Sequence, residues 1–223
     1  MLAGEAVVAI WNGLAPGAHA AFHDWHIHEH IPERVGIPGF RRGRRYVAAD
    51  AATHPEFFTL YEADTLQVLQ GADYARRLDA PTPATTAVTA QFRDTFRALA
   101  RVLSSHGPGS GGTLLTLRLD AAPEAMAALA ALAAAAERAP RVTGAHLCQA
   151  DAAASGVRSA ESRGRADIGA PPALFVLIEA TDAAALAPLL PDAALAAAGA
   201  RLPVLRGLYR LEYSRSKTAW GTG

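Results

Sequence analysis

The chain has 223 residues, and 51% of them are hydrophobic, which is enough to bury the core of one large domain or two small ones. Its 21 Lys and Arg residues balance 21 Asp and Glu residues, so no overall field attracts nucleic acid or a membrane surface. The single cysteine, Cys148, excludes an intramolecular disulfide and is typical of a reducing compartment. Residues 1–13 lack a signal-peptide pattern and no apolar run spans a bilayer, so we expect a soluble cytoplasmic protein.

Hydrophobic periodicity divides the chain into two similar series of elements. The first series is a strand at 7–11, a helix at 17–30, strands at 40–49 and 56–63, helical segments between 65 and 89, and a strand at 95–103. The second series is a strand at 113–119, a helix at 123–138, strands at 142–150 and 173–180, a helix at 183–198 and a strand at 204–214. The third strands, FFTLYEAD at 57–64 and LFVLIEAT at 174–181, share Leu, Glu and Ala at matching places. Both series have the order β-α-β-β-α-β.

This order predicts two ferredoxin-like units, at 1–105 and 113–215. The Gly- and Pro-rich linker HGPGSGG at 106–112 joins them, and a tail follows at 216–223. Each unit would have a four-stranded antiparallel sheet with helices on one face only. We therefore expect an α+β fold in which the two sheets pack together as an α/β barrel with the helices outside. The space between the sheets is the expected ligand pocket.

The segment FHDWHIHEHIPERVGIPGFRRGRRY at 22–46 holds the densest group of chemically active side chains. On a helical wheel, Glu29 falls at the edge of an apolar side that includes Trp25. Partial desolvation there would raise the pKa of the carboxyl group and prepare it for proton transfer. The alternative is a structural role, in which Glu29 bonds to Arg44, Arg45 or a backbone N–H.

The dipeptide Ile31-Pro32 predicts that the helix ends at His30, because the residue before a proline is disfavoured in the α conformation. An imidazole at a helix C-terminus can cap free carbonyl groups. Alternatively, His30 forms an acid–base pair with Glu29. That pair requires the helix to break, since sequence neighbours on a helix do not face each other.

The helical spacing of four histidines also raises the question of a metal site. The row is His19, His23, His26 and His30. Two of these with a carboxylate could bind a divalent ion. No H-E-x-x-H motif occurs, and the helix face is expected to point to solvent. We therefore predict no metal site.

A predicted strand carries two alternating sets of side chains: Arg41, Gly43 and Arg45 on one face, and Arg42, Arg44 and Tyr46 on the other. This alternation holds only if no bulge intervenes at Gly43. One set could enter the barrel and hold a carboxylate or enolate oxygen. The alternative is an exposed strand edge that its charges protect from pairing.

The pattern WHIHEHIPERVGIPGFRRGRRY at 25–46 resembles the signature of small dimeric α/β-barrel proteins in the EthD-like and related uncharacterised groups. The matching residues are Trp25, Glu29, His30, Pro32, Pro38, Gly39, Phe40, Arg45 and Tyr46, followed by Pro55, Tyr61 and Tyr74. The similarity covers the first unit, and the second unit has no E-H-x-P turn. It implies a barrel of two such units, fused here in one chain. The superfamily includes monooxygenases, lactone isomerases, cyclases, dehydratases and haem proteins, so the resemblance does not fix a reaction.

Together these observations predict a small-molecule enzyme or binder that uses no cofactor and acts on a small carbonyl or aromatic compound by proton transfer or oxidation. The expected catalytic residues are Glu29, His30, Arg45 and Tyr46, and the expected ligand-binding residues are Trp25, His26, Tyr61 and Tyr74. One alternative is a non-catalytic ligand-binding or assembly protein. Another is a haem-binding barrel, for which His146 is the obvious ligand from the second half. We expect a small-molecule partner and neither nucleic acid nor membrane, and a homodimer is left open. The helix at 123–138 should serve packing alone.

Overall fold

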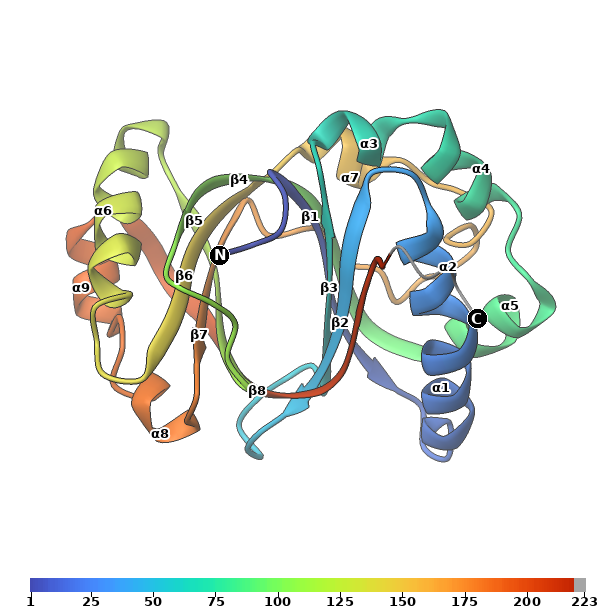
Figure 1. Ribbon diagram of the computed structural model, residues 1–223, viewed down its shortest axis with the longest axis horizontal. Helices are drawn as coiled ribbons and strands as arrows, with labels where there is room; N and C mark the ends of the chain where they lie inside the picture. The colour runs from blue at the N-terminus through green and yellow to red at the C-terminus, as the bar shows by residue number, and fades with distance from the viewer. Residues whose placement is uncertain (219–223) are drawn as a thin grey trace.

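The computed structural model describes residues 1–218 and contains a closed antiparallel barrel of eight strands (Figure 1). The strands are β1 (Ala6–Leu14), β2 (Phe40–Ala48), β3 (Phe57–Ala63), β4 (Phe92–His106), β5 (Thr113–Ala121), β6 (Val142–Ala150), β7 (Leu174–Ala180) and β8 (Ala200–Ser216). Their order around the barrel is β1-β3-β2-β8-β5-β7-β6-β4. The first half supplies β4-β1-β3-β2, and the second supplies β8-β5-β7-β6. The predicted α+β barrel is therefore confirmed. In the tail predicted at 216–223, residues 219–223 lie outside the described part.

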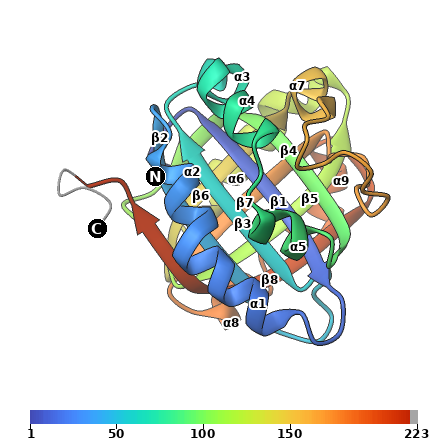
Figure 2. The same cartoon turned by 90° about the vertical axis from the view of Figure 1, so that its right-hand side faces the viewer.

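Helices surround the barrel on both sides (Figures 1 and 2). Those of the first half are α1 (His19–Trp25), the π-helix η1 (His26–His30), α2 (Ile31–Gly36), α3 (Leu66–Gln70), α4 (Ala72–Asp79) and α5 (Pro83–Thr89). Those of the second half are the 3-10 helix η2 (Pro123–Ala125), α6 (Met126–Ala136), α7 (Ala152–Gly156), α8 (Ala183–Leu186) and α9 (Asp192–Ala197). Helices α6, α8 and α9 cover one end, whereas α1, η1 and α2 form one continuous rod on the other side.

Two ladders join the halves, β2 with β8 and β4 with β6. The sequence predicted sheets stacked face to face, but the hydrogen bonds run on from one half into the other. Strand β2 thus lies between β3 and β8, so the alternative of an exposed, charge-protected edge is wrong for it. Closure gives every strand of the barrel two neighbours and fixes which side chains of β2 point inward.

Side chains fill the barrel, so its interior is not the pocket that the sequence predicted. The ring of Trp11 lies 4.9 Å from that of Phe58 and 5.4 Å from that of Phe175. Cys148 is buried in the same cluster, where desolvation raises the pKa of its thiol. Because large inward-facing residues alternate along strands from both halves, they occupy the space that a ligand would need.

One part of the barrel interior holds a buried ion cluster, made of Arg42, Arg44, Glu62, His146 and Glu179. Arg44 forms ion pairs with Glu179 at 2.7 Å and with Glu62 at 3.0 Å, Arg42 pairs with Glu62 at 2.8 Å, and His146 Nε2 lies 3.4 Å from Glu179. Burial alone would raise the pKa of Glu179, but the neighbouring His146 and Arg44 lower it to about 2. The two glutamates are the ones that match between FFTLYEAD and LFVLIEAT. The equivalent third strands therefore bring equivalent carboxylates to one shared arginine.

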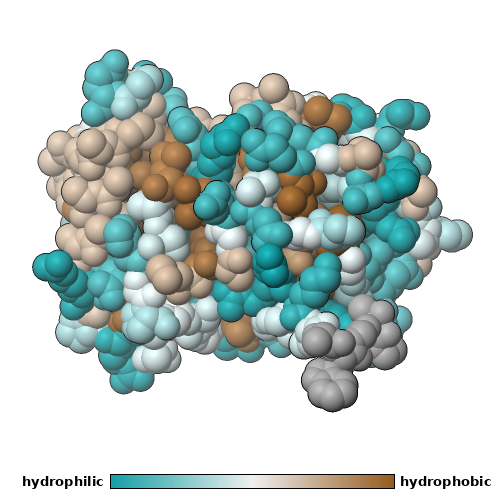
Figure 3. Space-filling model, turned by 45° about the horizontal axis from the view of Figure 1, so that its top comes forward, coloured by the Kyte–Doolittle hydropathy of each residue, from teal (hydrophilic) through white to brown (hydrophobic). Residues whose placement is uncertain are grey.

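The surface turned to the viewer in Figure 3 mixes hydrophilic with apolar residues. Among the large hydrophobic side chains, Val157 is notable because 65% of it is exposed. Within residues 1–218, no helix has the length and apolar character needed to cross a membrane.

Candidate functional site

The candidate site is a cavity of about 60 Å³ between the rod α1–η1–α2 and the outer faces of β1, β3 and β4. Its floor consists of side chains that alternate outward on the three strands: Ile10, Asn12, Thr59, Tyr61, Thr95 and Arg97. Its roof consists of Trp25, His26, His30 and Arg34. Helices α4 and α5 close two sides, and the loop at 157–170 closes another. The site thus belongs to the first half but is covered by a loop of the second.

A π-turn in the rod points both roof histidines at the sheet. The N–H of Ile31 donates to the carbonyl of His26, and Ile31 keeps helical angles of φ −66° and ψ −45° although Pro32 follows. The prediction that the helix ends at His30 is therefore wrong. A wider turn accommodates the missing N–H and the ring of the proline without ending the helix. As a result His26 is 3% exposed and His30 is 5% exposed, so the expected solvent-facing histidine row is also wrong at these two positions.

The two buried imidazoles are neutral bases that face the cavity. Burial lowers the pKa of both well below 6.5; Arg45 lowers that of His26 further, and Arg34 that of His30. In the described part of the chain, the Nδ1 atoms of both rings are buried without a hydrogen-bond partner. The hydroxyl of Tyr61 lies 3.5 Å from Nε2 of His26, at the outer limit of a hydrogen bond.

Glu29 does not line the cavity but is connected to its wall by hydrogen bonds. Its carboxylate accepts hydrogen bonds from the hydroxyl groups of Thr82 and Thr85, the latter at 3.2 Å. Thr85 Oγ1 also accepts a hydrogen bond of 3.0 Å from the indole N–H of Trp25, which lines the cavity. The structural role predicted from the sequence was a bond from Glu29 to Arg44, Arg45 or a backbone N–H. The observed hydrogen-bond partners of Glu29 are instead two threonines at the start of α5. This network fixes the orientation of the Trp25 ring.

Arg45 and Tyr46 point to opposite faces of β2, as the alternation predicted. Arg45 lies against the ring of Phe22, 5.5 Å from its centre, and bonds to Glu212 at 3.1 Å. Tyr46 points into the barrel, where burial raises the pKa of its hydroxyl. Neither residue lines the cavity. The structure thus places His30 with Trp25, His26, Tyr61 and Tyr74 around the cavity, and Glu29, Arg45 and Tyr46 outside it.

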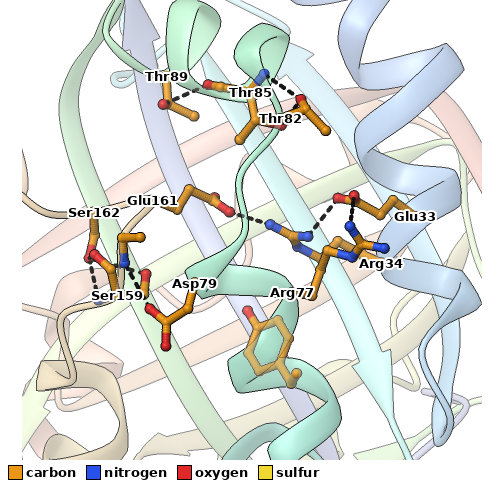
Figure 4. Close-up of polar contacts among 12 residues, drawn as sticks. Glu33, Arg34, Arg77, Asp79, Thr82, Thr85, Thr89, Ser159, Glu161 and Ser162 are labelled. Atoms are coloured by element: carbon orange, nitrogen blue, oxygen red, sulfur yellow. Dashed lines mark hydrogen bonds and ion pairs between the residues drawn. The ribbon is translucent and has the colours of Figure 1, made fainter.

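Figure 4 shows contacts across the cavity rim that the sequence analysis missed. The buried guanidinium of Arg34 bonds to Glu33 at 2.7 Å and, on its other side, to Glu161 from the loop. Arg77 reaches the same Glu33 at 2.7 Å. Asp79 accepts a 2.9 Å hydrogen bond from the N–H of Ala160, which fastens the loop a second time. Arg34 stands two places after Pro32 in the conspicuous segment, but nothing local indicated Glu161, 127 residues further along.

The second half therefore contributes more than packing. Helix α6 buries only Leu129, Ala133 and Ala136 on its sheet, as expected for residues 123–138. In contrast, the loop at 157–170 places Ser159, Glu161, Ser162 and Arg165 around the cavity.

A haem group does not fit these residues. His146, the ligand expected from the second half, lies inside the barrel, 2.9 Å from Ser105 and beside Glu179. The cavity of about 60 Å³ is also far below the roughly 300–1,000 Å³ of sites for larger ligands. In residues 1–218, no group of three His, Cys, Asp or Glu side chains is arranged to hold a metal ion.

No family model and no curated protein matches the chain, but solved structures do. An anthrone oxidase-like protein superimposes with a TM-score of 0.61 and 13% identity, over 95% of this chain and 92% of that one. A candidate monooxygenase from Fusobacterium nucleatum subsp. nucleatum gives 0.56 and 9%, over 97% and 96%. A candidate chlorite dismutase gives 0.54 and 11%, over 94% and 96%. At these identities the likeness concerns the fold, and the chain has the dimeric α/β-barrel type of fold.

Proposed function

We propose that this protein is a cofactor-independent enzyme that removes a proton from a small carbonyl or phenolic compound bound in the first half. The observation that carries the proposal is the pair of imidazoles, His26 and His30, held neutral and buried at a cavity with their Nδ1 atoms unpartnered. An unsatisfied buried polar atom costs about 1–3 kcal/mol. A ligand that donates a hydrogen bond to these nitrogens would remove this cost.

The lining residues supply the groups that such a reaction needs. A neutral imidazole can accept the proton, and both His30 and His26 line the cavity. The negative charge then develops on an oxygen of the substrate, and the Tyr61 hydroxyl is the nearby donor that stabilises it. The apolar ring of Trp25 in the cavity wall lowers the local polarity. It thereby strengthens the interaction of the substrate with the imidazole and with the oxyanion donor. A narrower form of this proposal is that dioxygen then oxidises the resulting anion. The name of the anthrone oxidase-like neighbour suggests this reaction.

Hydrogen–deuterium exchange tests the proposal without knowledge of the final product. Small 1,3-dicarbonyl compounds and hydroxy-substituted aromatic ketones are incubated with the protein in D2O, and loss of the acidic C–H signal is followed by NMR. We expect the parent to accelerate exchange for some members, and His30→Gln or His26→Gln to slow it about 100-fold or more, the usual contribution of a general base.

The matched control is His28→Gln, on the same turn of the rod, because its side chain is 73% exposed. This variant should exchange like the parent. Equal rates in all three variants, with ligand binding retained, would leave a non-catalytic binding protein as the better interpretation.

Glu29→Gln tests the positioning role of the carboxylate. Glutamine keeps an acceptor oxygen for Thr82 and Thr85, so we expect a loss of only about 1 kcal/mol in the free energy of unfolding. The exchange rate should stay within about threefold of the parent's, a change of less than 1 kcal/mol in the barrier. A loss as large as that of His30→Gln would instead restore Glu29 to the proton-transfer step.

We also propose that the halves are tandem ferredoxin-like units at 1–105 and 113–215, joined at 106–112. The strand orders β4-β1-β3-β2 and β8-β5-β7-β6 support this, since equivalent strands occupy equivalent places. An EthD-like relationship rests on the W-x-x-x-E-H-x-P and P-G-F patterns. Because the fused chain closes its own barrel, a homodimer is not needed to complete the fold.

A further inference from the structure

A second, larger cavity of about 360 Å³ adjoins the candidate site. The two cavities share four wall residues: Tyr74, Leu78, Arg97 and Ser159. The larger one lies between α3, α4 and α7, over the outer face of β4. Its volume falls within the range of small-molecule sites, whereas that of the smaller cavity is below it. A hydrocarbon chain therefore has room in the larger cavity and not in the smaller one.

The larger cavity is apolar over most of its wall. Leu69, Leu99 and Ala154 are buried and supply its inner part. Val157 lies at its outer part and is 65% exposed. Its apolar side chain is therefore available to contact an apolar ligand. These side chains favour an apolar body and reject a strongly hydrated one.

Arg97 provides the one strong polar feature at the junction of the two cavities. Its guanidinium bonds to the Tyr74 hydroxyl at 3.1 Å, and no carboxylate among residues 1–218 forms an ion pair with it. The other arginines of the smaller cavity are neutralised: Arg34 by two glutamates and Arg165 by Asp167, at 2.7 Å. A half-buried arginine with no counterion at the end of an apolar cavity is complementary to an anion.

We infer that the larger cavity binds an amphipathic carboxylate, with the carboxylate on Arg97 and the hydrocarbon chain against Leu69, Leu99 and Val157. The acid would then have its carboxyl end at the shared wall. This site stands independently of proton transfer by the histidines.

Isothermal titration calorimetry with three probes of equal chain length tests the inference: octanoate, octan-1-ol and octylammonium. Octanoate should bind the parent at least tenfold more tightly than octanol, since a hydrogen bond to a charged group contributes about 1.5–3 kcal/mol. Octylammonium should bind most weakly. Titrations are kept below the critical micelle concentration.

Two variants locate the ligand. Arg97→Met keeps the apolar bulk and removes the charge, so it should weaken octanoate about ten- to hundredfold and leave octanol unchanged. Ala153→Trp places a large ring at an exposed position of the cavity wall without altering the core, and it should reduce binding of both probes. The matched control is Arg158→Met, an exposed arginine of the same wall, which should change octanoate affinity less than about threefold.

Equal affinity for octanoate and octanol would overturn the inference, as would unchanged octanoate binding in Arg97→Met or no detectable binding by the parent. The His30→Gln variant should bind octanoate like the parent. Failure of the proton-transfer proposal would therefore show in exchange rates alone, and failure of the carboxylate site in affinities alone.

Discussion

Replacing Arg44 with methionine is expected to lower the free energy of unfolding by about 3–5 kcal/mol, the usual cost of breaking a buried ion pair from one side. The substitution removes the cation that Glu62 and Glu179 share in the barrel interior, where they are 0% and 1% exposed. Glu62 then keeps Arg42, whereas Glu179 is left with His146 as its remaining basic neighbour. Urea unfolding at neutral pH measures the effect. Because whole domains are stable by only about 5–15 kcal/mol, this single change should remove a large share of the total.

Arg41→Met is the matched control, since Arg41 lies on the same strand but is 54% exposed and pairs with Asp64 at the surface. It should lower the free energy of unfolding far less than Arg44→Met does, because solvent screens the exposed pair. Combining Arg44→Met with Glu179→Gln should recover part of the loss, because the carboxylate that has lost its arginine is then absent, while Glu62 keeps its pair with Arg42. If Arg44→Met costs no more than Arg41→Met, the cluster does not stabilise the barrel.

Lowering the pH from 6.5 to 5.0 should destabilise the protein through His26 and His30, by at most about 3 kcal/mol if both stay neutral in the fold. Their pKa values lie well below 6.5 in the folded state and near 6.5 in the unfolded state. The unfolded chain therefore binds protons first, so stability is full above pH 6.5 and falls below it. Each histidine contributes about 1.4 kcal/mol per pH unit for as long as it stays neutral in the fold. Glu179 contributes only at lower pH, from 4.5 down to about 2.

Urea unfolding at the two pH values, at constant ionic strength, checks this effect. His26→Gln and His30→Gln should each remove about half of the pH dependence. The exposed His28 makes His28→Gln the control, which should retain all of it. An unchanged pH dependence in the double variant His26→Gln/His30→Gln would show that other groups control acid stability.

Much of the fold could be predicted from sequence because its signals are local and occur twice. Alternating apolar residues marked the strands, and the matching glutamates of the third strands indicated equivalent halves. The alternation along β2 also correctly separated Arg45 from Arg44 and Tyr46. The state of the barrel interior could not be predicted, since it depends on how Trp11, Phe58 and Phe175 from different strands fill a common volume.

The candidate site was predicted in part, and its missing parts have physical reasons. Wheel analysis at 100° per residue cannot anticipate a π-turn, so it assigned His26 and His30 to a solvent-facing row. Glu161 and Arg97 reach the cavities through long-range packing, and neither belongs to a recognisable motif. Trp25, Tyr61 and Tyr74 were identified through the resemblance rather than through spacing.

The loop at 157–170 has a consequence for how such a protein changes over generations. In a symmetric pair of identical chains, any mutation in a covering loop alters two sites at once. In this single chain the loop at 157–170 occurs once. It can therefore vary in length and composition without a matching change at a second site. One end of the molecule can thus be adapted to new compounds while the all-apolar packing at the other end preserves the barrel.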